Sequence, residues 1–431
     1  MQLSRFVDFV PIENDFLAYN TLTQSVLFLD QKSKDIITNN PKQAAEDANF
    51  APLLEEKFLV PSSIDESTIV KSWYQSVLDN NTELNLTILT TYACNLACVY
   101  CVEDGVIQPI LMDLATQNKV IKWIENEILS KHILKVKICF YGGEPLLNLK
   151  AVEIISNSVR ELCYEKEIEY RAEMITNGLL LSKETAENLA SWGIQQLKLT
   201  IDGDRTQHNL KRPAKNQTDC YQTILDNIFN IPDSIDLIIS GNYDRENIPT
   251  FPVLLNELNV LRLENRIKHI SFKPILNTLV GSSPVTKHCA SPSISDADLS
   301  AMISLRNEAK SHGFNVPDYL ALGPCEFNNQ NSLVIDPTGK FYKCAGFVGR
   351  KEFCIGSIKT GYNKQYQNFI NIPLPESCID CKYVPACGGG CRYCAQVKYG
   401  DYRKVVCEKK YFETVAKQVL IDDYYPQTQP V

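Results

Sequence analysis

Six short apolar runs, separated by stretches of helical length, set the strongest limit on how this chain can fold. The runs are rich in Val, Ile, Leu and Thr and lie at residues 84–91, 136–143, 171–178, 196–203, 235–243 and 267–274. The amphipathic stretches predict helices at 113–130, 149–166, 182–193, 220–231 and 247–265. Strands that alternate with helices pair in parallel through right-handed crossovers. The pattern therefore predicts an α/β fold whose sheet is open or curled into a partial barrel.

Unusual residues lie at or just beyond the ends of four of the predicted strands. In chain order they are the cysteines Cys94, Cys98 and Cys101, then Gly-Gly-Glu-Pro (142–145), Thr-Asn-Gly (176–178) and Asp202-Gly203. In parallel α/β sheets, functional side chains collect beyond the carboxyl ends of the strands. We therefore expect these four segments to meet on one rim of the sheet.

Charge and cysteine content narrow the class of protein. A net charge of -8 and a pI near 5.4 create no positive field for a phosphate backbone, so nucleic acid is not an expected partner. Asp8, Glu13 and Asp15 interrupt the N-terminal segment where a secretion signal needs an apolar run, and no later run approaches a membrane span. We expect a cytoplasmic protein, in which 16 cysteines indicate metal binding or catalysis rather than disulfides.

Cys94, Cys98 and Cys101 form a Cys-x3-Cys-x2-Cys triplet directly after the first predicted strand. In a four-iron, four-sulfur cluster each thiolate ligates one iron, so three thiolates leave one iron open to a ligand that is not protein. The spacing also permits a zinc site completed by a distant fourth ligand. The triplet thus indicates a metal centre, and the other rim segments favour the iron–sulfur alternative.

This triplet, followed by Tyr-Gly-Gly-Glu-Pro at the next strand end, resembles the radical S-adenosylmethionine (SAM) superfamily. The resemblance covers about residues 84–410 and implies a partial (β/α)6 barrel in which SAM chelates the open iron. One electron from the cluster would cleave SAM to methionine and a 5′-deoxyadenosyl radical. The chain would then be an oxidoreductase supplied by an external one-electron donor of flavodoxin or ferredoxin type.

The same resemblance implies SAM contacts at Tyr100, Gly142, Gly143, Glu144, Asn177, Asp202 and Arg212. The glycines and the glutamate would hold the methionyl ammonium, because glycine permits close backbone approach and oxygen atoms accept from a cation. The tyrosine would border the adenine, and the arginine would pair the SAM carboxylate. Asn177 and Asp202 would contact the sulfonium region and the ribose, although Asn-Gly and Asp-Gly are also ordinary turn sequences.

A second group of cysteines comprises Cys325, Cys344, Cys378, Cys381, Cys387, Cys391 and Cys407. Their order resembles the SPASM domain, an extension of radical SAM enzymes that carries two auxiliary four-iron clusters and would bring the total to three. Family precedent assigns Cys378, Cys381, Cys387 and Cys407 to the outer cluster and Cys325, Cys344 and Cys391 to the inner one. The inner cluster would take Cys354 or Cys289 as its fourth ligand or keep an open iron. A pair of zinc ribbons is the alternative for this region.

Relatives with SPASM domains abstract hydrogen from a carbon of a peptide or protein. The favoured interpretation is a maturase of ribosomally made peptides (a RiPP maturase) that installs a thioether, carbon–carbon or carbon–oxygen crosslink. Residues 201–213 (IDGDRTQHNLKRP) are also similar to anaerobic sulfatase-maturing enzymes, which make formylglycine. A ferredoxin-like electron-transfer protein is the alternative of another class, but it has no need of a Gly-Gly-Glu-Pro rim. The sequence identifies neither a general base nor the modified residue, the bond formed or the oligomeric state.

The domains expected are 1–80, 81–285 and 286–431. Residues 16–30 (FLAYNTLTQSVLFLD) resemble two short strands and precede polar helical stretches. The first region is therefore either a cap on the sheet or a small α+β domain. As a domain it would resemble the winged helix of RiPP maturases and bind the leader of a precursor peptide as an added strand. The last region would be a loop-rich, cluster-binding domain.

Overall fold

The computed structural model describes residues 1–103, 105–275 and 295–428. These residues cluster in two compact units. The barrel unit comprises 80–317 and 326–371, and the terminal unit comprises 1–79, 318–325 and 372–431. No helix in the described ranges is long and apolar enough to cross a bilayer.

The barrel unit is built on one sheet, which has ten strands in the described part of the chain in the order β11-β10-β9-β8-β7-β6-β12-β13-β14-β15. The strands are β6 (Glu83–Leu89), β7 (Lys135–Tyr141), β8 (Glu169–Thr176), β9 (Gln196–Thr200), β10 (Asp236–Tyr243), β11 (Ile267–Pro274), β12 (Ser332–Ile335), β13 (Lys340–Tyr342), β14 (Gly356–Ser357) and β15 (Gly361–Tyr362). Strands β6 to β11 pair in parallel with their sequence neighbours, which confirms the predicted sheet. The sequence did not predict β12, which joins the sheet parallel to β6 and continues it into three short antiparallel strands.

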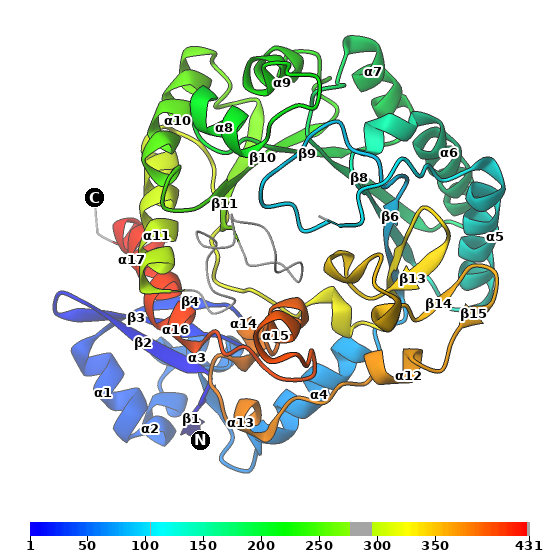
Figure 1. Ribbon diagram of the computed structural model, residues 1–431. Helices are drawn as coiled ribbons and strands as arrows, with labels where there is room; N and C mark the ends of the chain where they lie inside the picture. Colours follow the sequence, from blue (N-terminus) through cyan, green and yellow to red (C-terminus); the bar gives the residue numbers. More distant parts are fainter. Residues whose placement is uncertain (104, 276–294, 429–431) are drawn as a thin grey trace. The chain divides into compact units, whose positions relative to one another are not determined.

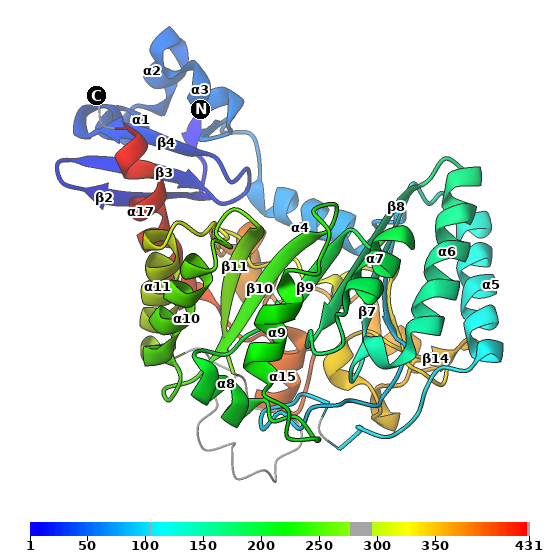
Figure 2. The ribbon, with the colours of Figure 1, turned by 90° about the horizontal axis from the view of Figure 1, so that it is seen from above.

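Helices line the outer side of this curved sheet (Figure 1). They are α5 (Leu114–Ser130), α6 (Leu149–Glu165), α7 (Lys183–Ser191), α9 (Cys220–Ile228), α10 (Phe251–Val260) and α11 (Asp296–Ser311), with α5 and α6 side by side in Figure 2. The first five match the predicted helices, and acidic or hydroxyl side chains cap several of them. Asp113, for example, accepts from the Thr116 N–H at 2.7 Å. The short α8 (Arg205–Lys211) and α12 (Tyr366–Phe369) were not predicted.

Strand alternation gives the sheet two different faces. On β7 the side chains of Val136, Ile138 and Phe140 are at most 1% exposed and pack towards the helices. Lys137 and Cys139 alternate with them and face the opposite, inner side. The outer face therefore provides the hydrophobic core, and the inner face is free to carry polar chemistry.

The terminal unit contains the three-stranded antiparallel sheet β2-β3-β4, of which the sequence predicted only the last two strands. Its elements are β1 (Gln2–Leu3), β2 (Val7–Ile12), β3 (Asp15–Asn20), β4 (Val26–Asp30), α1 (Gln31–Asn39), α2 (Pro41–Glu46), α3 (Ala51–Glu55), β5 (Leu59–Val60), α4 (Glu66–Leu78), α13 (Glu376–Ile379), α14 (Val384–Cys387), α15 (Arg392–Tyr399), α16 (Lys409–Tyr411) and α17 (Lys417–Thr428). The C-terminal α17 packs against β2 and β3. Buried Asp8 on β2 accepts from Lys382 Nζ and Tyr383 Oη at 2.6 Å each, so the two ends of the chain form one unit.

Replacing Ile138 by Ala should lower the free energy of unfolding by about 2–5 kcal/mol, because the cavity it leaves on the helix side of β7 cannot fully collapse. Leu129→Ala on α5 is the matched control, since Leu129 is 60% exposed and Ile138 only 1%. Urea unfolding followed by circular dichroism measures both. Equal losses for the two variants would contradict the assignment of the outer face as the core.

Candidate active site

The cysteine triplet lies on the loop between β6 and α5. This loop has little regular structure, and the segment that follows α8 holds it in place. The N–H groups of Ala97 and Val99 donate to the carbonyls of Pro213 and Lys211 at 2.9 and 3.0 Å. Lys215 Nζ donates to the Cys94 carbonyl at 2.9 Å. The loop is therefore ordered by contacts with the fourth β–helix connection, which runs from β9 to α9.

The structure brings the three thiols of the triplet together. Burial raises the pKa of Cys94 to about 11 and that of Cys101 to about 12, and the charges of the thiols raise one another's pKa further. Burial also raises the pKa of Cys98, which the neighbouring charge of Arg212 lowers. Within the described ranges no group of three or more His, Cys, Asp or Glu side chains converges on a single ion. In an iron–sulfur cluster each thiolate ligates a different iron, so the thiols need not converge on one point. Three thiols near one another on an ordered loop therefore suit a cluster better than a single ion.

Gly142 and Gly143 let the second rim segment pack against the cysteine loop. Gly142 has φ +131°, and a Cβ built there would lie 2.4 Å from the Thr91 carbonyl oxygen. A Cβ on Gly143 would lie 2.2 Å from the Ala93 carbonyl oxygen. The Gly143 N–H donates to Thr91 O at 3.1 Å, and the next N–H donates to Ala93 O at 2.8 Å. The predicted meeting of these two strand ends is therefore observed, and it requires residues without side chains.

The carboxylate of Glu144 joins the second rim segment to the third. It accepts from the Thr176 hydroxyl at 2.7 Å, from the Asn177 N–H at 2.8 Å and from the Leu146 N–H at 3.0 Å. Burial raises its pKa, and these hydrogen bonds oppose the shift. Its expected contact with an ammonium group stays a prediction, because three of the acceptor positions of the carboxylate already have protein partners.

Asn177 and Tyr100 tie the cysteine loop to the later strand ends. Asn177 Nδ2 donates to Asn95 Oδ1 at 2.7 Å. The Tyr100 hydroxyl donates to Asp202 and accepts from Arg212 Nη1 at 2.7 Å. Arg212 Nη1 also lies 3.8 Å from Asp202 Oδ2. The expected adenine contact of Tyr100 stays a prediction, since the structure shows only what holds its hydroxyl.

The half-buried Tyr100 and the buried Asp202 and Arg212 form a polar group beside Cys98. Arg212 is 9% exposed, and its Nε has no hydrogen-bond partner among the described residues. An unpartnered buried N–H in a charged guanidinium suits an anionic ligand such as a carboxylate. Side chains in place of Gly142 and Gly143 would fill the space next to the triplet. The glycine pair and the Arg212 Nε donor together make the rim compatible with SAM.

Sequence reasoning missed two members of this polar group. Asn242, at the end of β10, donates from its backbone to Asp202 at 2.7 Å and from its side chain to the Tyr100 hydroxyl at 3.1 Å. His208 on α8 accepts from the Asp202 N–H through Nδ1 at 3.1 Å, and burial lowers its pKa to about 3. Asn242 had a detectable signal, because it lies near the end of the fifth predicted strand, as Asn177 and Asp202 lie near the ends of theirs. His208 had none, since its partner is a backbone group.

Three successive glycines organise the cysteines of the terminal unit. Gly388, Gly389 and Gly390 all have positive φ, and a Cβ on the first would lie 2.4 Å from Pro324 Cα. A Cβ on Gly390 would lie 2.4 Å from the Val406 carbonyl oxygen. The turn between Cys387 and Cys391 therefore packs directly against the residues that precede Cys325 and Cys407.

The predicted outer-cluster ligands influence one another electrostatically. Burial raises the pKa of Cys378, and Cys381 and Cys407 raise it further. Cys378 in turn raises the pKa of Cys387, after burial and Glu408. These four thiols therefore lie near one another within the terminal unit. Their assignment to one cluster stays a prediction.

The predicted inner-cluster ligands divide between the units. Cys325 and Cys391 belong to the terminal unit, and Cys344 to the barrel unit. Cys394, interpreted from sequence as a small apolar residue, is buried, and its thiol hydrogen-bonds to Cys391 and lowers the pKa of that cysteine. Cys289, one possible fourth ligand, lies outside the described residues.

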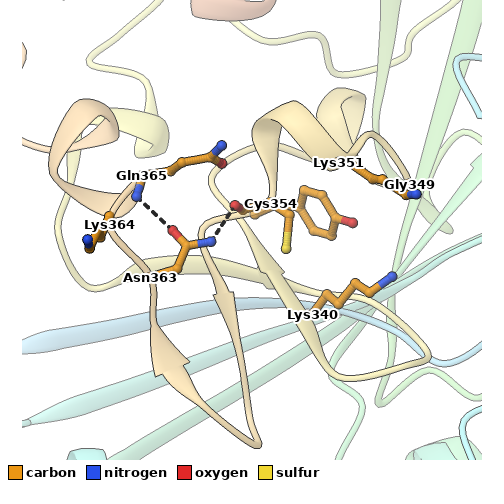
Figure 3. Close-up of a pocket in the computed structure, with 8 residues that line it drawn as sticks. Lys340, Gly349, Lys351, Cys354, Asn363, Lys364 and Gln365 are labelled. Atoms are coloured by element: carbon orange, nitrogen blue, oxygen red, sulfur yellow. Dashed lines mark hydrogen bonds between the residues drawn. The ribbon is translucent and has the colours of Figure 1, made fainter.

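Cys354, the other possible fourth ligand, lines a cavity of about 610 Å³ in the barrel unit (Figure 3). Its thiol donates to the Gly356 carbonyl at 3.4 Å. Lys340, Lys351 and Lys364 line the same cavity. The fourth ligand of the inner cluster therefore stays a prediction.

Comparison with known families supports the chemistry that this geometry suggests. Residues 88–250 match the model of the radical SAM superfamily, a range that includes the triplet, the glycine pair and Asp202. These residues form a radical SAM domain, and the chain is an enzyme of radical chemistry.

Two curated relatives span most of this chain. The mycofactocin maturase MftC of Mycolicibacterium smegmatis is 26% identical over 326 residues, which cover 71% of this chain and 77% of that protein. The cysteine-type anaerobic sulfatase-maturating enzyme of Clostridium perfringens is 22% identical over 334 residues, which cover 71% of this chain and 87% of that protein.

Two solved structures share the fold. Native anSMEcpe with bound AdoMet aligns with a TM-score of 0.61 and 19% identity over 79% of this chain and 97% of its own. Streptococcus suis SuiB bound to the precursor peptide SuiA aligns with a TM-score of 0.52 and 15% identity over 94% of this chain and 98% of its own. These likenesses confirm the α/β fold of the chain.

Gly143→Ala should weaken SAM binding by about tenfold or more, because the new methyl group would push the Ala93 carbonyl and with it the loop that carries Cys94. Leu129→Ala on α5 is the control in the same unit, since the Leu129 side chain is 60% exposed and needs no rearrangement of the backbone. Iron content and SAM binding by equilibrium dialysis measure the effect in anaerobically reconstituted protein. Normal iron content and SAM affinity in Gly143→Ala would contradict this packing argument.

Proposed function

We propose that this enzyme is a RiPP maturase: it removes a hydrogen atom from a carbon of a ribosomally made peptide and installs a thioether, carbon–carbon or carbon–oxygen crosslink. Two of the comparisons support a peptide substrate. MftC is a maturase, and the SuiB structure that aligns with 94% of this chain contains a precursor peptide. The carrying observation is the rim itself, where three thiols, a glycine pair and a buried, partly unpartnered Arg212 lie on adjoining strand ends.

The residues of the rim have separate tasks in this proposal. Cys94, Cys98 and Cys101 would hold a four-iron cluster, and Gly142, Gly143 and Glu144 would present oxygen acceptors to the SAM ammonium. Arg212 would receive the SAM carboxylate on its free Nε, while Asp202 and Tyr100 fix the guanidinium. When bound, the cluster and SAM supply an electron and a 5′-deoxyadenosyl radical. Because the fixed protein groups are already hydrogen-bonded to one another, little reorganisation is needed to orient the ligand.

Auxiliary clusters would belong to the same function. Cys378, Cys381, Cys387 and Cys407 would bind the outer cluster, and Cys325, Cys344 and Cys391 the inner one. The left-handed triple glycine supports this, because it brings the segments that bear Cys325, Cys387 and Cys407 against one another. Such clusters would accept the electron that crosslinking releases or hold a substrate thiol, and a flavodoxin or ferredoxin would supply the first electron.

The terminal unit has a surface suited to the leader of a precursor peptide. Strand β4 lies at the edge of its sheet, and its Phe28 is 41% exposed. A cavity of about 460 Å³ runs along one face of α1, lined at Gln31, Asp35 and Asn39 among others, and α1 follows β4 directly. A leader could pair with β4 and place side chains along α1, the usual mode of strand addition.

A sulfatase-maturing function is the second candidate. Its support is the similarity to the Clostridium perfringens enzyme over 71% of this chain. The two candidates differ in their protein substrate. A short peptide encoded beside this chain would favour the first, whereas a neighbouring sulfatase would favour the second. A bare electron carrier would explain the cysteines but not the glycine pair.

Cys98→Ala should abolish reductive cleavage of SAM to 5′-deoxyadenosine, because a cluster corner loses its thiolate. Cys163→Ala is the control, since Cys163 is buried in α6 on the helix side of the sheet. Chromatography of dithionite-reduced reactions measures the product. Cleavage by Cys98→Ala at the rate of the native chain would remove the proposed function, as would stoichiometric zinc in place of iron.

Phe28→Pro should weaken leader binding by about tenfold, because it removes an outward-facing donor from the edge of β4. The Asn20 N–H donates to the Ser25 carbonyl, so these two residues form a hydrogen-bonded pair between β3 and β4. Hydrogen-bonded and non-hydrogen-bonded pairs alternate along antiparallel strands, so Leu17 and Phe28 form a non-hydrogen-bonded pair. Their N–H groups therefore point away from each other, and that of Phe28 points outward from the sheet. Phe28→Ala keeps the donor and is the control. Fluorescence anisotropy with the labelled peptide encoded beside this chain measures binding, and equal affinity of both variants would contradict strand addition at β4.

A further inference from the structure

Residues 339–366 of the barrel unit form a basic segment in an otherwise acidic chain. The basic residues of the segment are Lys340, Lys343, Arg350, Lys351, Lys359 and Lys364. Its acidic residue is Glu352, whereas the whole chain has a net charge of -8. Lys343 is buried and donates to the Ser332 carbonyl at 2.6 Å, so it belongs to the framework. The exposed lysines of the segment are the ones that a partner can reach.

Three exposed lysines of this segment line one cavity. Lys340, Lys351 and Lys364 line the cavity of about 610 Å³ that also contains the Cys354 thiol (Figure 3). Among the residues that the structure describes, none of the three forms an ion pair. By contrast, Lys137 on the same sheet pairs with a carboxylate at 2.9 Å. The cavity therefore presents three positive charges that are not paired within the described part of the chain.

Hydrogen bonds and ring stacking fix the loop that carries Lys364. Asn363 Nδ2 donates to the Cys354 carbonyl at 2.9 Å (Figure 3). Tyr362 is stacked on Tyr366 with ring centroids 4.0 Å apart, yet its side chain is 36% exposed. Exposed tyrosines are enriched at protein interfaces. The cavity thus lies on a fixed surface that combines unpaired charge with an exposed aromatic ring.

Gly349 brings one wall of the cavity against the cysteine loop. Its φ is +80°, and a Cβ built there would lie 2.2 Å from Cγ1 of Val106. Val106 belongs to the loop between β6 and α5 and follows Cys101 in the chain. Lys351 comes soon after Gly349, so this contact joins the basic segment to the later part of the cysteine loop.

A buried aspartate joins a second wall to the start of the same loop. Asp336 is 1% exposed, and its Oδ2 accepts from the Tyr92 hydroxyl at 2.7 Å. Its Oδ1 accepts from the Lys340 N–H at 2.9 Å. Tyr92 immediately precedes Ala93 and Cys94. The cavity therefore adjoins the cysteine loop on both sides of the triplet, and all of these contacts lie within the barrel unit.

We propose that Lys340, Lys351 and Lys364 form the docking surface for an acidic one-electron carrier protein. Carboxylates around the cofactor of the carrier would pair with the three ammonium groups, while the net negative charge of the remaining chain disfavours other faces. Redox proteins meet through small interfaces, so a surface of a few side chains suffices. The three lysines are exposed rather than enclosed, which favours a protein partner over a small anion held inside the cavity.

The need for a carrier rests on the proposed function, whereas the choice of surface rests on the lysine cavity and its contacts. One electron leaves the reduced carrier, which is thereby oxidised, and reduces the cluster that Cys94, Cys98 and Cys101 would hold. No proton or group is transferred in this step. Docking at the lysine cavity would place the cofactor of the carrier beside the loop that bears these thiolates.

Calorimetric titration tests the surface without using SAM cleavage. The reconstituted enzyme is titrated at low ionic strength with two acidic probes, a bacterial flavodoxin and a bacterial ferredoxin. The triple variant Lys340→Glu, Lys351→Glu, Lys364→Glu should bind the carrier about tenfold more weakly or worse and lose most of the salt dependence of binding. Lys183→Glu on α7 is the matched control, since its side chain is 77% exposed and the change of charge is the same at each site.

Carbodiimide crosslinking locates the contact on the native chain. The reagent joins a lysine amine to a carboxylate that lies against it, and mass spectrometry identifies the joined residues. We expect crosslinks to the carrier from Lys340, Lys351 or Lys364 and none from Lys183. This measurement needs no substitution, so it stays informative if the triple variant fails to fold, which thermal unfolding checks.

The choice of reductant separates docking from chemistry. With dithionite, which needs no docking surface, the triple variant should form 5′-deoxyadenosine at the rate of the native chain. With limiting reduced carrier it should be about tenfold slower, in line with the weaker binding. Equal rates of the variant and the native chain with the carrier would contradict the assigned surface.

The proposal is overturned if the native chain binds neither probe, if Lys183→Glu loses as much affinity as the triple variant, or if all crosslinks come from other lysines. Loss of inorganic phosphate binding in the triple variant, with carrier binding unchanged, would assign the cavity to a small anion instead. Binding and crosslinking do not depend on peptide modification. A failure here therefore leaves the proposed function standing, and a failure of that function leaves these measurements valid.

Discussion

The close approach of the Gly142–Gly143 backbone to the carbonyls of Thr91 and Ala93 is the contact on which the site depends. Any side chain at either glycine would come within 2.4 Å of a carbonyl oxygen. The contact fixes the start of the cysteine loop against the end of the second strand, and Glu144 extends the connection to the third. A loop without regular structure thereby obtains a defined position, which three thiolates on one cluster require.

The second constraint is that charged groups buried near the site need partners of opposite charge or hydrogen-bond partners. Arg212, Asp202 and Tyr100 neutralise and hydrogen-bond one another, and Lys211 next to them pairs with Asp244 at 2.6 Å. Burying these groups without partners would cost several kcal/mol each.

Much of this could be predicted because local patterns carry it. The alternation of apolar runs and amphipathic stretches indicated β6 to β11 and the helices between them, and the spacing of Cys94, Cys98 and Cys101 indicated the cluster loop. Strand β12 was missed because its four residues show no alternation and its only signal is a long-range pairing with β6. Strand β2 was missed because Asp8 and Pro11 interrupt its apolar pattern. The structure accommodates both residues: β2 lies at the edge of its sheet, where Pro11 can lack an N–H group, and Asp8 is paired with Lys382.

The sequence by itself determined which chemistry is available: thiol spacing, the glycine pair and strand-end polar residues are local properties that survive without knowledge of contacts. Only the tertiary structure decided how the groups are used. It directed the carboxylate of Glu144 towards Thr176 and Asn177 and left Arg212 Nε without a partner among the described residues. These outcomes depend on strand register and on which buried groups find partners, and both are set by contacts between residues far apart in the chain.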